Sequence, residues 1–172
     1  MSPDTAADTA ADTAADTAAL DALIAEVVAQ EERLQFSTFS ADDAWMLGGR
    51  LRALGLERSL AIAIDIALGE HRLFHCALPG TSAHNGAWIE RKKATVREFG
   101  TSSYLVGLRA KRGGGVFEAQ PWIDTLRFAG HGGGFPIALR GTGVVGTIAV
   151  SGQPQEVDHA LIVEALTAHL GV

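Results

Sequence analysis

The fold is decided by residues 60–78, LAIAIDIALGEHRLFHCAL, which carry the pattern of a β-hairpin. Isoleucine recurs at every second position over residues 62–66, which is typical of a strand with one buried face. A turn centred on Gly69 follows, and residues 71–78 return as a second strand-like run. Two such runs around a short glycine-containing turn predict an antiparallel pair.

A second hairpin is predicted nearer the C-terminus. Residues 135–139 and 144–150 have strand-like composition and are separated by a glycine-containing turn at 140–143. The glycines from Gly141 to Gly146 match the dinucleotide-binding pattern G-x-G-x-x-G, but that pattern works only when a helix follows it. Here a strand-like run follows, so we interpret the glycines as turn and strand residues.

Helical periodicity surrounds the two hairpins. It predicts five helices, over about residues 18–34, 40–55, 84–99, 101–111 and 154–170. Ser40 is a good N-cap for the second of these, with Asp43 in the capping-box position. Between residues 113 and 130 the pattern is weak, and a short helix is expected to begin near Pro121. Helices that flank two hairpins predict an α+β domain with a mostly antiparallel sheet.

The N-terminus is of low complexity. Residues 4–19 repeat the tetrapeptide DTAA four times, which places Asp side chains at i, i+4 spacing without basic partners. Aspartates at that spacing repel one another, and Ala and Thr are too small to build a core. We therefore expect residues 1–19 to form a disordered or fraying arm and residues 20–172 to form a single domain.

Composition excludes several classes of protein. The chain has 172 residues and a net charge of −6, and four of its 20 acidic residues lie in the repeat, so a basic nucleic-acid-binding face is not expected. No apolar run is long enough to span a membrane, and no secretory signal is apparent. The single cysteine, Cys76, leaves no internal disulfide. A cytoplasmic protein without membrane or nucleic-acid partners is expected.

A glycine-rich loop is the first candidate site. His131 is followed by Gly132, Gly133, Gly134 and Phe135. Such a loop turns tightly and can present backbone N–H groups to an anion, although it could equally be a plain lead-in to the following strand. The pattern is similar to an esterase oxyanion loop, but the chain lacks the G-x-S-x-G nucleophile motif that such enzymes need.

A cationic and aromatic cluster on the helix over residues 84–99 is the second candidate. Trp88 precedes Arg91, Lys92 and Lys93, and His84 lies at the helix boundary, where functional side chains are common. Together these residues could bind a flat, apolar molecule that carries carboxylates, or they could form a solvated helix face. The six histidines show no metal-binding spacing, so no metal site is predicted.

Several motifs in residues 36–171 resemble the haem-degrading-domain family that includes HbpS. They include Arg91–Thr95, Gly132–Ile137 and Val145–Gly152. Other motifs are similar to a branch of that family with unknown function: Trp88–Lys92, Phe99–Tyr104, His131–Ile137 and Asp158-His159. The resemblance implies a profilin-like α+β fold, a homo-oligomer built on dimers, and haem as a ligand in the wider family. Of the site residues, it carries over Lys92, Lys93 and Gly132–Phe135. Trp88 departs from the haem-binding members, and His131 belongs to the pattern of the uncharacterised branch.

Three functions follow as hypotheses. The first is an oligomeric small-molecule-binding protein, with haem or another tetrapyrrole as the leading ligand and His131 or His84 as the axial ligand. The second is a homo-oligomeric scaffold without a ligand. The third is an enzyme with His131 or Asp158 as its acid or base and Ser102, Ser103 or Ser151 orienting the substrate. Asp158 and His159 diverge on a helix and cannot form a dyad, so Asp158 also fits a simple helix-dipole role.

Overall fold

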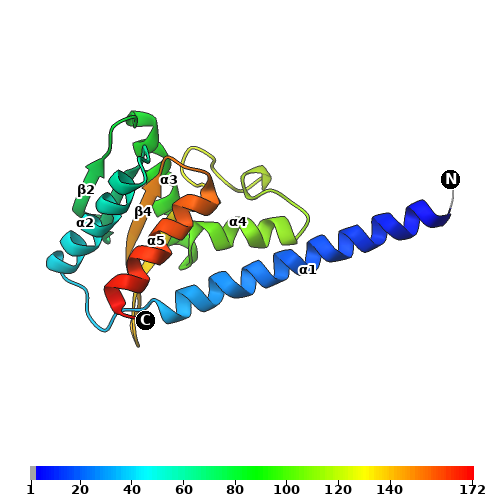
Figure 1. Ribbon diagram of the computed structural model, residues 1–172, viewed down its shortest axis with the longest axis horizontal. Helices are drawn as coiled ribbons and strands as arrows, with labels where there is room; N and C mark the ends of the chain where they lie inside the picture. Colours follow the sequence, from blue (N-terminus) through cyan, green and yellow to red (C-terminus); the bar gives the residue numbers. More distant parts are fainter. Residues whose placement is uncertain (1–2) are drawn as a thin grey trace.

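The structure, a computed structural model, describes residues 3–172, with side chains from residue 15 onward. These residues form five α-helices, one 3-10 helix and four strands (Figure 1). The helices are α1 (Pro3–Arg33), α2 (Ala41–Glu57), α3 (Ala83–Phe99), α4 (Ser103–Arg112), η1 (Phe117–Ala119) and α5 (Gln155–Leu170). The strands are β1 (Ala63–Leu68), β2 (His71–Ala77), β3 (Gly134–Leu139) and β4 (Gly143–Ser151). No helix within residues 3–172 combines the length and hydropathy that a membrane crossing needs.

The strands form one antiparallel sheet in the order β2-β1-β4-β3. Each predicted hairpin is present, and the two are joined in the centre of the sheet by the pairing of β1 with β4, in which Ile64 lies opposite Val150. Gly146 lies within β4, as the interpretation of the glycine pattern required. The predicted α+β fold with two hairpins is confirmed.

The alternation of side chains along β1 gives the sheet two different faces. Ile62, Ile64 and Ile66 face the main core, where they pack with apolar residues of α2 and α5. Figure 1 shows these two helices next to each other, and they are in contact. On the other face the small residues Ala63 and Ala149 pack against Ile89 of α3. Small side chains on this face let α3 lie close to the sheet. The position of α3 in turn places its side chains at the site described below.

Helix α1 is longer than the predicted helix over residues 18–34. It begins at Pro3, so the DTAA repeat continues the helix, and Figure 1 shows α1 passing α4 and projecting beyond the body. The apolar packing of α1 involves Leu20, Leu23 and Val27, which contact Tyr104 and its neighbours on α4. The boundary between an arm of residues 1–19 and a domain of residues 20–172 therefore stays a prediction, as does disorder of the arm.

The expectation of a short helix that begins near Pro121 is wrong. The only helical turn that the structure assigns within residues 113–130 is η1, and Pro121 lies in the turn after it. The aromatic ring of Phe117 is buried against Val106 and Phe128, and it also meets Phe99 edge to face. Burial of these rings, rather than helix propensity, determines the path of this segment.

Candidate ligand-binding site

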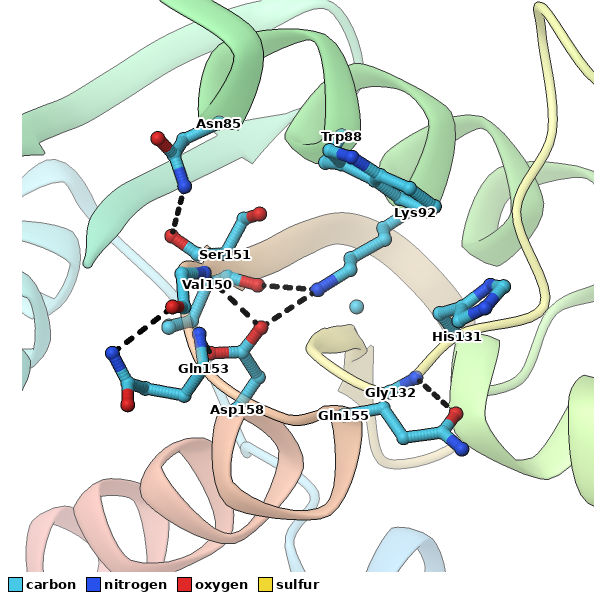
Figure 2. A network of polar contacts seen from close by, with 12 residues as sticks. Asn85, Trp88, Lys92, His131, Gly132, Val150, Ser151, Gln153, Gln155 and Asp158 are labelled. Carbon is cyan, nitrogen blue, oxygen red and sulfur yellow. Dashed lines mark hydrogen bonds and ion pairs between the residues drawn. The ribbon is translucent and has the colours of Figure 1, made fainter. Parts of the chain in front are cut away.

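A pocket of about 240 Å³ opens where three segments meet (Figure 2). The segments are the N-terminal half of α3, the loop before β3, and the connection from the end of β4 into the first turn of α5. The pocket is lined by His84, Asn85, Trp88, Lys92, His131, Ser151, Gly152, Gln153, Gln155 and Asp158.

Helix α3 presents three lining residues through its regular repeat. His84, Trp88 and Lys92 are four residues apart and therefore share one face of the helix. The start of the helix is fixed by Ser82, whose side chain accepts a hydrogen bond from the N–H of His84. Asn85 then donates its side-chain N–H to the carbonyl of Ser151, at 3.3 Å, which joins the start of α3 to the end of β4.

A buried ion pair lies at the inner end of the pocket. The Nζ of Lys92 lies 2.9 Å from a carboxylate oxygen of Asp158 and donates a second hydrogen bond, also of 2.9 Å, to the carbonyl of Val150. The exposed fractions of the two side chains are 4% and 1%. Asp158 also accepts hydrogen bonds from the backbone N–H groups of Gly152 and Gln153. The pair therefore links α3 to β4 and to α5.

Burial shifts the pKa of each member of this pair in the direction that favours its neutral form. Desolvation lowers the pKa of Lys92, and the nearby carboxylate of Asp158 opposes that shift. Desolvation raises the pKa of Asp158, and Lys92 and the two backbone N–H groups oppose it. A proton shared over this hydrogen bond is therefore less firmly held on the amine than in an exposed ion pair.

His131 lies at the mouth of the pocket, and a carboxylate orients it. Its Nδ1 lies 3.0 Å from an oxygen of Glu118, which also accepts the backbone N–H of Gly130. Because a carboxylate oxygen accepts, Nδ1 carries the hydrogen in the neutral ring and Nε2 keeps its lone pair. The side chain is 44% exposed, and its ring centroid lies 5.1 Å from that of Trp88.

Trp88 connects the two histidines of the site. Its indole N–H donates to Nε2 of His84, at 2.9 Å, so that nitrogen already accepts a hydrogen bond. On the Trp88 ring lies the guanidinium of Arg91, 3.9 Å from the centroid. The predicted combination of aromatic and cationic side chains is therefore present, with Arg91 beside the pocket rather than in its lining.

The remaining predicted residues lie elsewhere. Lys93 is buried on a different side of α3, where it pairs with Asp65 at 2.7 Å. Phe135 is in the core, against the ring of His159. The N–H of Gly132 donates to Gln155 and that of Gly134 donates to Ser103. Since these two N–H groups are already bonded, the structure favours the lead-in interpretation of the loop over an anion-binding role.

Gly133 has a steric function in the pocket. Its φ is +104°, and a Cβ there would clash with the carbonyl oxygen of Val150 and lie 2.7 Å from Nζ of Lys92. Only glycine lets the loop lie this close to the buried ion pair.

Sequence reasoning did not find the full lining. The sequence predicts a helix-dipole or acid–base role for Asp158, and nothing in the spacing connects it to Lys92, which is 66 residues away. Glu118, Asn85 and Gln155 were not predicted at all. Glu118 lies in the segment with no clear pattern, so no local signal could have identified it as the partner of His131.

Comparisons with known proteins agree with this fold. A UPF0303 protein of Streptomyces avermitilis is 50% identical over 143 residues, which cover 83% of this chain and 88% of that protein. The solved structure of the Ybr137w protein has a TM-score of 0.79 and 33% identity, and covers 86% of this chain and 88% of its own. A structure described as a PduOC:Heme complex has a TM-score of 0.64 at 15% identity, over 77% and 94% of the two chains, and so shows the fold alone.

The family comparison covers most of the domain. Residues 39–167, from the N-terminus of α2 to the last turn of α5, match the family described as haem degrading protein HbpS-like. This range includes every residue that lines the pocket. The sheet order, the motifs and the match together show that the chain belongs to the HbpS-like family.

Proposed function

We propose that the protein binds a small molecule at this pocket, with haem or another tetrapyrrole as the leading ligand and His131 as its axial ligand. One observation carries the proposal: Glu118 holds Nδ1 of His131, so that Nε2 keeps a free lone pair at the mouth of the pocket. A carboxylate on the far nitrogen is the usual arrangement of a histidine that binds a metal ion. Nε2 of His84 already accepts from Trp88, so His84 suits this role less well.

The other residues fit a tetrapyrrole at the mouth of the pocket rather than inside it. The volume of about 240 Å³ is smaller than the roughly 300–1,000 Å³ of sites that enclose drug-sized ligands, and a tetrapyrrole is larger than most of these. Trp88 supplies a flat apolar surface beside His131, and Arg91 supplies a cation for a propionate. Bound haem would supply a redox-active iron centre.

The comparisons support the same ligand. The description of the family names haem degradation, and one structural neighbour is described as a haem complex. Those descriptions apply to those proteins, and for this chain they make haem the first ligand to test.

The test is a titration of the full chain with hemin, followed by the Soret band. Saturation at one haem per subunit or per dimer is expected, with a spectral shift that His131→Ala abolishes. Glu118→Gln, which keeps the shape of the side chain but removes its charge, is expected to weaken binding by about 10- to 100-fold. His71→Ala is the matched control, because His71 is exposed on β2 and does not line the pocket.

Two results would contradict this assignment. Absorbance that increases without saturation would remove haem as the specific ligand. A full spectral shift in His131→Ala, with loss of the shift in His84→Ala, would move the axial position to His84.

We propose self-association as a second property. The alternative hypothesis of a homo-oligomeric scaffold without a ligand also requires it. Self-association is supported by large apolar side chains on the surface, including Trp45 at 70% and Leu126 at 89% exposure. Light scattering after size-exclusion chromatography is expected to give a mass that is an even multiple of the chain mass. A monomer at micromolar concentration would contradict both the oligomer and the scaffold.

A further inference from the structure

We propose that Lys92 is a carbonyl-reactive lysine, and that the inside of the pocket accepts a small aldehyde or ketone as an imine on its Nζ. The inference rests on the proposed role of the pocket as a ligand site, but it does not depend on haem. It concerns the inner end of the pocket, whereas His131 lies at the mouth.

The position of the amine is the first argument. The Lys92 side chain is almost fully buried, yet it contributes to the pocket lining. Figure 2 shows Nζ directed toward Asp158 and Val150, at the centre of the lining residues. An ammonium has three donors, and these two partners account for two of them, so one position of the nitrogen remains for a ligand. The backbone at Gly133 has no side chain that would cover this nitrogen.

Asp158 is the second argument, because an amine reacts with a carbonyl group only after it has lost a proton. The carboxylate lies 2.9 Å from Nζ and is buried with it. Desolvation lowers the pKa of Lys92 and raises that of Asp158, so proton transfer between them costs less than in water. A lysine desolvated in this way is a recognised nucleophile for carbonyl compounds.

The reaction balances with these two groups alone. Lys92 first gives one proton to Asp158. The neutral amine then forms a bond to the carbonyl carbon, the carbonyl oxygen takes the proton from Asp158, and the nitrogen loses a second proton to the same carboxylate. The carbon–oxygen bond then breaks, the hydroxyl leaves as water with that proton, and a protonated C=N bond remains. Asp158 ends as it began, and no oxidant or reductant is needed.

The shape of the pocket defines the class of carbonyl compound. A volume of about 240 Å³ fits a molecule well below drug size. The rings of Trp88 and His131 stand at its side, which favours a flat aldehyde over a bulky one. Benzaldehyde is therefore a suitable probe.

The experiment is reductive trapping of the full chain with benzaldehyde and cyanoborohydride, followed by intact mass and peptide mapping. The sequence has three lysines, Lys92, Lys93 and Lys111, so each site can be quantified. Trapping is expected to be faster at Lys92 than at the exposed Lys111, because desolvation lowers the pKa of Lys92 and so favours its neutral amine. Lys93 is the matched control, because it is as buried as Lys92 but pairs with Asp65 outside the pocket.

Three variants separate chemistry from folding, with circular dichroism as the check of structure. Lys92→Arg is expected to abolish the rapid trapping, and Lys93→Arg to leave it unchanged. Asp158→Asn is expected to slow trapping at Lys92: it leaves more of the amine neutral, but it removes the carboxylate that carries protons to the carbonyl oxygen and the leaving water. Trapping at Lys92 that is no faster than at Lys111 in the wild-type chain would overturn the proposal. So would selectivity that persists in urea, because it would then not depend on the pocket. Hemin titration uses separate samples, so saturable haem binding without trapping rejects only this inference, and trapping without haem binding rejects only the haem assignment.

Discussion

Gly133 shows how one residue without a side chain defines the pocket. Its φ of +104° disfavours any other residue, and an added Cβ would meet the carbonyl oxygen of Val150. Gly133→Ala is expected to lower the free energy of unfolding by about 2–4 kcal/mol, because backbone strain and a clash add together. Gly141→Ala is the control: its φ is +76° and nothing lies within 4 Å of its Cβ, so a loss of only about 1–2 kcal/mol is expected. Urea denaturation measures both, and equal losses would contradict the steric argument.

His159 is buried on α5 and is held neutral. Desolvation lowers its pKa to about 4, and its Nε2 bonds to Gln30, whose own N–H₂ group donates to Glu26. The unfolded chain therefore binds more protons than the folded one between pH 4 and about 6.5, and stability must fall as the pH decreases through this window. The contribution lost from pH 7 to pH 4 is about 3 kcal/mol.

His159→Gln tests this contribution, because glutamine keeps a hydrogen-bonding side chain but does not titrate. Urea unfolding at several pH values is expected to show a shallower fall in stability below pH 6.5 for the variant than for the wild type. His71→Gln, at an exposed position, is the control for the substitution itself. Identical slopes in wild type and His159→Gln would show that His159 is not held neutral.

At the scale of elements, the sequence predicts those features that depend on residues close together in the chain, such as helix caps and strand periodicity. The capping box of Ser40 and Asp43 is present at the start of α2, and the period-two run of isoleucines forms β1. The prediction of a helix near Pro121 is wrong because burial of Phe117 and Phe128, which lie on either side of Pro121 in the sequence, determines the path of this segment. Helix α1 begins before the predicted residue 18, within a repeat where alanine propensity favours a helix and aspartate repulsion opposes it.

Helix α1 gives a prediction of its own. Among residues 15–172, whose side chains the structure describes, the apolar cluster that α1 shares with α4 starts at Leu20. Removal of residues 1–19 is therefore expected to change the free energy of unfolding by less than about 0.5 kcal/mol. Val27→Ala, in the packed part of the same helix, is expected to cost about 1–3 kcal/mol. The loss of far-UV ellipticity on truncation reports directly whether the repeat is helical in solution. A large loss of stability on truncation would show that the repeat belongs to the folded domain.

At the scale of the whole molecule, the site exists because distant segments converge. The motifs carry the family resemblance, and residue type and position predict His131, Trp88 and Lys92 as site residues. What could not be predicted was which of them meet. Lys92 and Lys93 are adjacent in sequence, but α3 directs one to Asp158 in the pocket and the other to Asp65 on β1. A single sequence gives no signal for contacts between residues separated by 66 positions, as Lys92 and Asp158 are.

The ion pair that joins these segments can be measured by a double-mutant cycle. Removing one partner leaves a buried, uncompensated charge, so Lys92→Met and Asp158→Leu are each expected to cost about 3–5 kcal/mol. The double variant is expected to cost clearly less than the sum, with a coupling of about 2 kcal/mol or more, although Gly152 and Gln153 then lose an acceptor.

The exposed pair of Arg58 and Glu164 is the matched comparison for this cycle. It also joins distant helices, the C-terminal end of α2 and α5, with a 2.6 Å contact, but its side chains are 44% and 45% exposed. Solvent screening limits such a pair to a coupling of about 1 kcal/mol or less. Because the two pairs are similar in contact distance and differ in burial, a larger coupling for Lys92 and Asp158 would measure what burial adds. Additive effects at both pairs would instead mean that the pocket does not hold α3 and α5 together through this charge contact.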